Sequence, residues 1–208
     1  MKKSATLRAV FVAAALAFGL AEAASAHFGI GAAMDAWFTP DCEPLRGFIN
    51  YGSLRLEADF FPYAGLDARL SCFSGSGSES AGHGWKGCDF DLDILALEAG
   101  PFLKLPLDPI ALYGGGGVGA YLSDGSLTVR EDGLKHSLDF GFGGEIGAYA
   151  FGGIQVFLTD NFLLFAEARY TWLNAEMETE WWNGGKFIDG ESGSFSGPGF
   201  ALGLMIWL

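Results

Sequence analysis

Apolar and polar side chains alternate along most of the chain, and the alternation is clearest at the C-terminal end. Between residues 199 and 208 the even positions carry the large apolar side chains Phe200, Leu202, Leu204, Ile206 and Leu208. The odd positions carry Gly199, Ala201, Gly203, Met205 and Trp207. Successive side chains of a strand point to opposite faces, whereas a helix does not keep an apolar residue at every second position. The pattern therefore predicts a β-strand.

The same period predicts seven further strands, and charged residues often occupy the face opposite the apolar one. In residues 162–174 the even positions are apolar or aromatic, and the odd positions include Glu167 and Arg169. In a transmembrane barrel the apolar face would meet lipid and the charges would point into the interior, the lumen. The other predicted strands are 28–38, 53–61, 66–73, 89–104, 110–122 and 138–158.

In residues 89–104 the charged side chains do not all fall on positions of the same parity. Asp91 and Asp93 fall on odd positions, whereas Glu98 and Lys104 fall on even positions. We expect a β-bulge near Leu95 to invert the phase. We also expect the strand to end early, because a proline such as Pro101 cannot donate a hydrogen bond within a sheet.

Short and long connections alternate between the predicted strands. Short turns are expected at 61–65, 105–109 and 159–161, and long polar loops at 39–52, 74–88, 123–137 and 175–198. This asymmetry is typical of outer-membrane barrels, whose short turns face the periplasm. We predict an antiparallel up-and-down β-barrel of eight strands with both termini in the periplasm. The alternative is a soluble periplasmic β-sandwich, in which the apolar faces would form a shared core.

The N-terminal segment has the pattern of an export signal. Lys2, Lys3 and Arg8 precede an apolar stretch that ends before the small-residue site Ala24-Ser25-Ala26. We predict a signal peptide over residues 1–26 and a barrel domain over residues 27–208. After residue 26, no uninterrupted apolar run reaches the roughly 20 residues of a spanning helix.

Composition narrows the function classes. The chain has 208 residues, of which half are hydrophobic, with 32 Gly, 19 Phe and a net charge of −13. Without residues 1–26 the count is 9 basic against 24 acidic residues, a net charge of −15. So acidic a chain repels nucleic-acid backbones, and we expect no nucleic-acid partner.

Three segments resemble the last hairpin of small outer-membrane barrels of the OmpA/OmpX-like superfamily. They are residues 140–147 (FGFGGEIG), 158–161 (LTDN) and 166–170 (AEARY). The C-terminal strand, with Phe200, Leu202, Leu204, Ile206 and Leu208, resembles the assembly signal of that group. The resemblance implies outer-membrane lipid and lipopolysaccharide as surroundings, and periplasmic chaperones and the barrel-assembly machinery as partners in biogenesis.

An eight-stranded barrel is just wide enough for side chains to fill its interior. Buried charges must be paired or solvated, so we predict a salt-bridged and partly wet plug. A proton or ion path through these charges is the alternative. The predicted lumen residues are Asp35, Arg55, Glu57, Asp59, Asp67, Arg69, Glu145, Glu167 and Arg169.

The three cysteines are Cys42, Cys72 and Cys88. Export to an oxidising compartment permits a disulfide, and Cys72 and Cys88 flank one predicted loop. We predict this pair, with Cys42 as a competitor. Their spacing and the lack of histidine partners make a metal site improbable, so we expect no metal ion and no cofactor.

No catalytic set stands out in the sequence. His136-Ser137 invites comparison with lipid-modifying enzymes that use His and Ser, but adjacent strand residues point to opposite faces. The glycines 114–117 lack the Lys-Ser/Thr and the helix of a phosphate-binding loop. We therefore predict no catalytic residues.

The last loop is acidic and carries Trp181 and Trp182. We expect the tryptophan pair to anchor at the membrane interface, and divalent cations bridging the loop carboxylates to lipopolysaccharide are the alternative.

The expected function is a non-enzymatic envelope-structural or surface-interaction role through the long loops. Two alternatives stay open: a narrow channel for small ionic or hydrophobic solutes, and a lipid-modifying enzyme. The sequence does not give the oligomeric state.

Overall fold

The computed structural model describes residues 27–40, 47–79, 87–131, 134–142, 144–176, 178–180 and 192–208. Its strands are β1 (His27–Phe38), β2 (Gly47–Phe61), β3 (Ala64–Glu79), β4 (Gly87–Pro106), β5 (Ile110–Glu131), β6 (Leu134–Gly141), β7 (Glu145–Phe157), β8 (Phe162–Trp172), β9 (Asn174–Glu176), β10 (Glu178–Glu180), β11 (Ser192–Ser194) and β12 (Gly197–Trp207). The predicted signal peptide, residues 1–26, lies outside the described residues. No helix among the described residues is long and apolar enough to cross a membrane.

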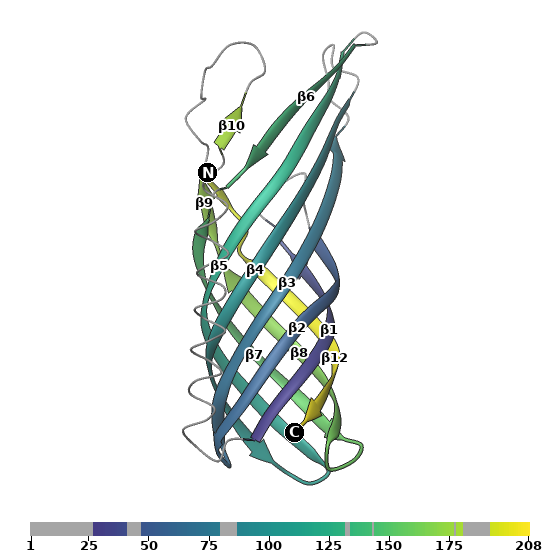
Figure 1. The fold of residues 1–208 in the computed structure, drawn as a ribbon. Helices are drawn as coiled ribbons and strands as arrows, with labels where there is room; N and C mark the ends of the chain where they lie inside the picture. Colours follow the sequence, from purple (N-terminus) through teal and green to yellow (C-terminus); the bar gives the residue numbers. More distant parts are fainter. Residues whose placement is uncertain are drawn as a thin grey trace.

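Eight strands close a barrel in which each pairs antiparallel with its neighbours (Figure 1). The ring runs β1, β2, β3, β4, β5, β7, β8 and β12, and β12 pairs with β1 to close it. Closure leaves the barrel wall without an unpaired edge. The predicted up-and-down barrel of eight strands is therefore confirmed.

The two ends of the barrel differ. The short connections at residues 62–63, 107–109 and 158–161 gather at one end, where the C-terminus also lies (Figure 1). The backbone N–H of Leu208 donates to the carbonyl of Phe28 at 2.8 Å, so β1 starts beside the end of the chain. We call this end the turn end and the opposite end the loop end.

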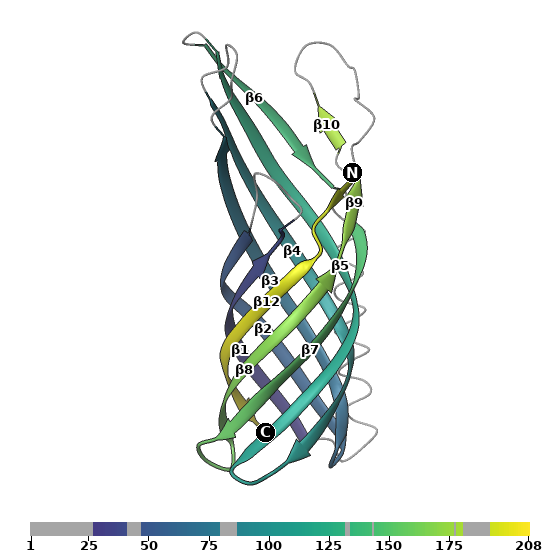
Figure 2. The ribbon, with the colours of Figure 1, turned by 180° about the vertical axis from the view of Figure 1, so that it is seen from behind.

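Three neighbouring strands are the longest of the barrel, and β4 and β5 exceed all others by several residues. β3, β4 and β5 have 16, 20 and 22 residues, whereas β1 has 12 and β8 and β12 have 11 each. They rise beyond the barrel at the loop end, where β6 pairs with β5 and β10 pairs with β6 (Figure 2). We call this projecting sheet the wall. Much of the predicted loops 74–88 and 123–137 is thus paired strand.

The expectation for residues 89–104 is wrong. β4 pairs with β3 from Cys88 to Leu103 without a register shift, and it continues through Pro101 to Pro106. Its even positions point inward throughout, so Glu98 and Lys104 lie in the lumen and Asp91 and Asp93 lie outside. The register shifts involve β2 instead: its pairing with β3 shifts between Ile49 and Ser53 and again between Asp59 and Phe61, and its pairing with β1 shifts between Ala33 and Asp35.

A further irregularity lies between β6 and β7. Ser123 of β5 donates a backbone bond to Phe142, whereas Tyr121 pairs with Glu145, so the connecting segment holds one extra residue. Gly144 there has a φ of +127°, a conformation that glycine adopts without strain. The shift lets Phe142, an even residue, point inward beside the odd positions of β7.

Gly117 of β5 marks a close approach to β4. A Cβ atom there would lie 2.7 Å from Cα of Gly100 and would also meet the carbonyl of Ala99. We expect Gly117→Val to lower the free energy of unfolding by about 1–3 kcal/mol, because backbone must move to make room. Gly52→Ala is the control, since nothing lies within 4 Å of a Cβ at that position. Urea titration in detergent measures both, and equal losses would contradict this packing.

Candidate functional site: the filled lumen

The lumen brings together oppositely charged side chains from distant parts of the chain, where they form buried ion pairs among the described residues. In β1, β3, β5, β7, β8 and β12 the odd positions point inward, and in β4 the even positions do so. The buried polar and charged residues are Asp35, Thr39, Asn50, Ser53, Arg55, Glu57, Asp67, Arg69, Ser71, Glu98, Lys104, Gln155, Glu167, Arg169 and Thr171.

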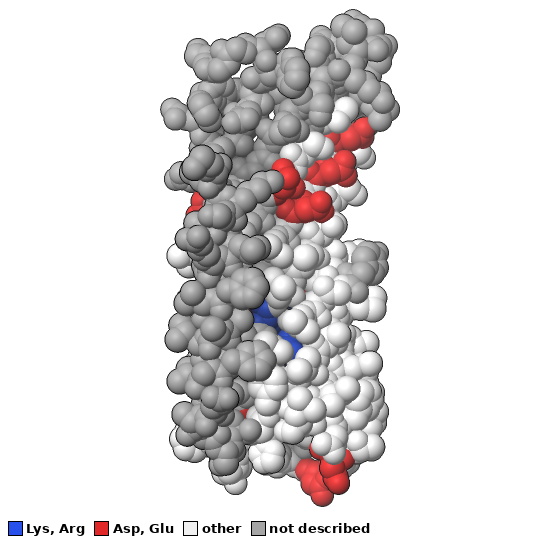
Figure 3. All heavy atoms as spheres, viewed as in Figure 1, with Lys and Arg blue, Asp and Glu red and all other residues white. Residues whose placement is uncertain are grey.

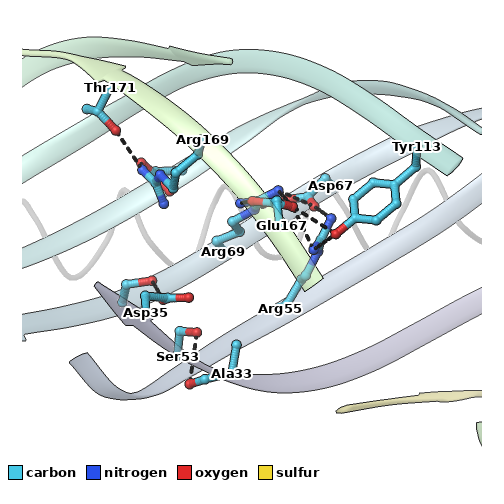
Figure 4. A network of polar contacts seen from close by, with 12 residues as sticks. Ala33, Asp35, Ser53, Arg55, Asp67, Arg69, Tyr113, Glu167, Arg169 and Thr171 are labelled. Atoms are coloured by element: carbon cyan, nitrogen blue, oxygen red, sulfur yellow. Dashed lines mark hydrogen bonds and ion pairs between the residues drawn. The ribbon is translucent and has the colours of Figure 1, made fainter. Parts of the chain in front are cut away.

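Two arginines and two carboxylates form the centre of the network (Figure 4). Arg69 on β3 meets Asp67 through Nε and Nη2 at 2.7 and 3.0 Å, and it meets both oxygens of Glu167 on β8. Arg55 on β2 contacts Asp67 at 2.6 Å and Glu167 at 2.9 Å. Tyr113 on β5 donates its hydroxyl to Glu167 at 3.1 Å. Planar guanidinium groups suit such multiple contacts with carboxylates.

Aromatic rings flank these arginines. The Cζ atom of Arg69 lies 4.3 Å from the ring centre of Phe151, and that of Arg55 lies 4.8 Å from the ring centre of Phe165. A cation over an aromatic face is stabilised by the ring electrons. The arginines are therefore held by charge on one side and by rings on another.

A second ion pair lies nearer the loop end. Arg169 of β8 contacts Glu98 of β4, and its Nη2 also donates to the Thr171 hydroxyl at 3.0 Å. The hydroxyl of Tyr121 donates to the same Glu98 oxygen at 2.6 Å. The predicted lumen set lacked Glu98, although a bulge near Leu95 would also have turned this even position inward; the structure buries Glu98 on a strand that has no bulge.

A third group lies nearer the turn end. Lys104 binds Asp59 at 2.7 Å, and its Nζ atom lies 4.3 Å from the ring centre of Trp207. Gln155 of β7 donates its amide to both oxygens of Glu57, at 3.2 and 3.0 Å. Gln155 was absent from the predicted network, because alternation points to lumen residues most strongly when they are charged.

Asp35 lies apart from the arginine cluster (Figure 4). Its carboxylate accepts from the Asn50 amide at 3.3 Å and from the Ser71 hydroxyl at 3.5 Å. No ion pair joins it to another described residue. Glu145, also predicted for the network, is half-buried at the start of β7 and has no ion-pair partner within the described part of the chain.

Apolar layers close both ends of this polar interior. At the loop end, large aromatic side chains pack together and are almost fully buried: Trp37, Phe48, Phe73, Tyr121, Phe142 and Phe195. At the turn end the layer is Leu163, Phe165, Met205 and Trp207, of which Trp207 is the most exposed at 7%. The lumen is therefore filled by side chains along its length.

The predicted disulfide is not formed in this structure. Cys72 of β3 pairs with Leu95, and Cys88 of β4 pairs with Glu79, so the two cysteines lie far apart along the hairpin. Cys72 is a free and exposed cysteine on the outer face. The prediction failed because β3 and β4 continue as paired strands well beyond Cys72. Cys42 lies outside the described residues.

The remaining predicted sites lie in β6, in β12 or outside the described residues. Trp181 and Trp182 lie outside the described residues. His136 and Ser137 lie in β6, where their backbones pair with Val129 and Thr128. No group of His, Cys, Asp and Glu in the described ranges has the arrangement of a metal site. Phe200, Leu202, Leu204 and Ile206 of the predicted assembly signal point outward on β12, and Leu208 follows the strand; their role as a signal stays a prediction.

Comparison with known proteins supports the fold. No protein-family model and no curated protein matches the sequence. The outer membrane protein OprG of Pseudomonas aeruginosa has a TM-score of 0.61 at 9% identity, over 88% of this chain and 95% of OprG. A major outer membrane protein of Thermus thermophilus has a TM-score of 0.59 at 14% identity, over 87% of this chain and 99% of that protein. This chain therefore has the fold of small outer-membrane β-barrels.

Arg169→Met tests the energetics of the network. The substitution leaves Glu98, which is 1% exposed, without its cation, and we expect a loss of about 3–5 kcal/mol in the free energy of unfolding. Adding Glu98→Gln removes the stranded charge and should restore most of that loss. Urea titration of the wild type, the two single variants Arg169→Met and Glu98→Gln, and the double variant gives the coupling. Losses that simply add would show that the pair does not act as a unit.

Proposed function

We propose that the chain is an integral outer-membrane protein and a non-enzymatic scaffold that presents the projecting wall to the cell exterior. The observation that carries this proposal is the filled lumen, which lies between two apolar layers. A barrel without a free path cannot act through its interior, so the parts available for interaction are its outer surfaces.

The outer face of the barrel supports membrane insertion. On β4 the outward side chains from Leu95 to Leu105 are uncharged, and Asp93 follows at the loop end. Ten residue steps span about 33 Å along a strand, which a tilt near 45° reduces to about 23 Å in height. This matches the apolar band of about 25 Å in outer-membrane barrels. Figure 3 shows a largely uncharged surface in which only a small patch of basic atoms is visible, with acidic groups gathered above it on the wall and others at the turn end.

The wall supports a role at the surface. Its outward side chains are short and oxygen-rich, with Asp89, Asp91 and Asp93 in register between the serines of β3 and the residues Asp124, Ser126 and Thr128 of β5. Ser74 donates to Asp93 at 2.6 Å. Such a face is suited to water rather than to lipid, and a rigid sheet held clear of the membrane can meet other molecules.

Two residues on the outer face of β5 test the position of the membrane. Val118 lies opposite Ala99 in the middle of the apolar band, and Ser126 lies opposite Asp91 on the wall. We expect Val118→Lys to lower folding stability in lipid vesicles by about 2–4 kcal/mol and Ser126→Lys to change it little. Urea titration with heat-modifiable gel mobility measures both. Equal effects would contradict insertion at this depth.

Conductance separates the scaffold from the channel alternative. We expect the purified protein to give no steady current steps in planar bilayers, because apolar layers cap the lumen at both ends. An open porin in the same bilayers is the positive control for insertion. Reproducible single-channel steps from this protein would overturn the scaffold proposal in favour of a channel.

The enzyme alternative has its own test. A barrel that modified lipids through His136 or Ser137 would lose lipid turnover when either residue is replaced by alanine. We expect turnover in lipopolysaccharide-containing vesicles to stay at the level of protein-free vesicles for the wild type and both variants. Turnover by the wild type that disappears in the variants would establish an enzyme instead.

A further inference from the structure

The charges inside the barrel do not balance. Six carboxylates and four basic groups of the described residues are buried in it or paired there, not counting the half-buried Glu145 at the start of β7. The carboxylates are Asp35, Glu57, Asp59, Asp67, Glu98 and Glu167, and the basic residues are Arg55, Arg69, Lys104 and Arg169. With every group ionised, the interior carries two negative charges in excess.

The ion pairs locate the excess. Glu98 with Arg169 and Asp59 with Lys104 are each neutral pairs. Arg55 and Arg69 are shared by three carboxylates, because Arg55 also contacts Glu57 at 2.9 Å. One surplus charge thus belongs to this group of five, and the other belongs to Asp35.

Within the group of five, Glu57 is the least compensated carboxylate. Asp67 and Glu167 each contact both arginines, whereas Glu57 contacts only Arg55. Glu57 is fully buried, at 0% exposure. An isolated buried charge is far more costly than a neutral group, so a compensating cation or proton is expected at each surplus site.

We propose that the folded barrel binds two protons at neutral pH, one on Asp35 and one on Glu57. Both residues then stand in the lumen as neutral carboxylic acids, and the interior as a whole has no net charge. This inference concerns the interior only and is independent of the proposed surface function.

The surroundings of Glu57 suit a carboxylic acid. The Gln155 side chain faces it, and the carbonyl oxygen Oε1 of that amide is buried without a hydrogen-bond partner. The two ends of an amide are interchangeable by a half-turn. After such a turn, Oε1 accepts the proton of Glu57, which an ionised carboxylate could not supply. The charged groups facing Glu57 are Arg55, Asp67 and Lys104.

The surroundings of Asp35 are neutral at contact distance. β2 contributes Asn50 and Ser53, and β3 contributes Ser71, and the serine hydroxyls can donate or accept. The charged groups that face it from further away are Arg69 on β3, and Glu167 and Arg169 on β8. Those cations are already engaged by Asp67, Glu167 and Glu98. The next inward residues on β1 are Trp37 of the loop-end layer and Ala33, which packs with the residues of the turn-end layer.

Infrared spectroscopy of the full chain in detergent micelles tests the proposal directly. A protonated carboxyl has a C=O stretch that carboxylates lack, and exposed acidic residues are ionised at neutral pH. We expect the wild type at pH 7 to show an acid band equivalent to two carboxyl groups per chain. Asp35→Asn should remove one half of the band and Glu57→Gln the other half.

Asp160→Asn is the matched control, because Asp160 lies exposed in the turn between β7 and β8 and should leave the band unchanged. Carbon-13 labelling of aspartate alone gives a test without any variant, since it should shift only the Asp35 half. Absence of an acid band in the folded wild type would overturn the proposal. In that case a melting temperature that rises when sodium replaces choline would assign the sites to an alkali cation instead.

Discussion

The narrow interior of a closed ring of eight strands is the main constraint on this molecule, because it has room for side chains and for little else. Arg55 and Arg69 meet this constraint by bridging strands that lie on different sides of the ring. Their contacts with Glu167 join residues 112 and 98 positions apart in the chain. A network of this kind can form only when the ring is complete, so it couples closure of the barrel to satisfaction of its buried charges.

The two apolar layers enclose the network of buried charges. Between the aromatic residues at the loop end and Leu163, Met205 and Trp207 at the turn end, the charged groups have little access to bulk water. Electrostatic interactions are stronger in such an environment, and unpaired charges are more costly. The same closure that stabilises the ion pairs fills the lumen with side chains of the described residues, which is the basis for proposing that contacts with other molecules fall to the outer surfaces and the wall.

Alternation alone was sufficient to predict the barrel and eight of the lumen residues, because one face of each strand must be apolar when the other is charged. It failed at β4. There the aspartates that point outward on the wall occupy odd positions, whereas the inward-pointing charges Glu98 and Lys104 occupy even positions. The simpler explanation is that β4 keeps one alternation throughout and that the surroundings of its outer face change from lipid to water at Asp93. To predict this from the sequence, one must know how far the strand projects beyond the barrel. The length of β3 and β4 likewise determines the distance between Cys72 and Cys88. This length could not be predicted, because the serine- and glycine-rich parts of these strands have the composition of loops. The roles of Gln155 as a partner of Glu57 and of Tyr113 as a partner of Glu167 depend on contacts between residues far apart in the chain, which no local sequence pattern reveals.

Accessibility of spin labels along β4 tests the central claim of a sealed barrel in lipid most directly. Single labels at successive residues from 89 to 105, in a chain without its native cysteines, would be exposed to oxygen and to a water-soluble relaxation agent. We expect odd positions 95–105 to respond to oxygen, odd positions 89–93 to respond to the aqueous agent, and even positions to respond to neither. Aqueous access at the even positions, or a phase that inverts within 89–105, would contradict the account.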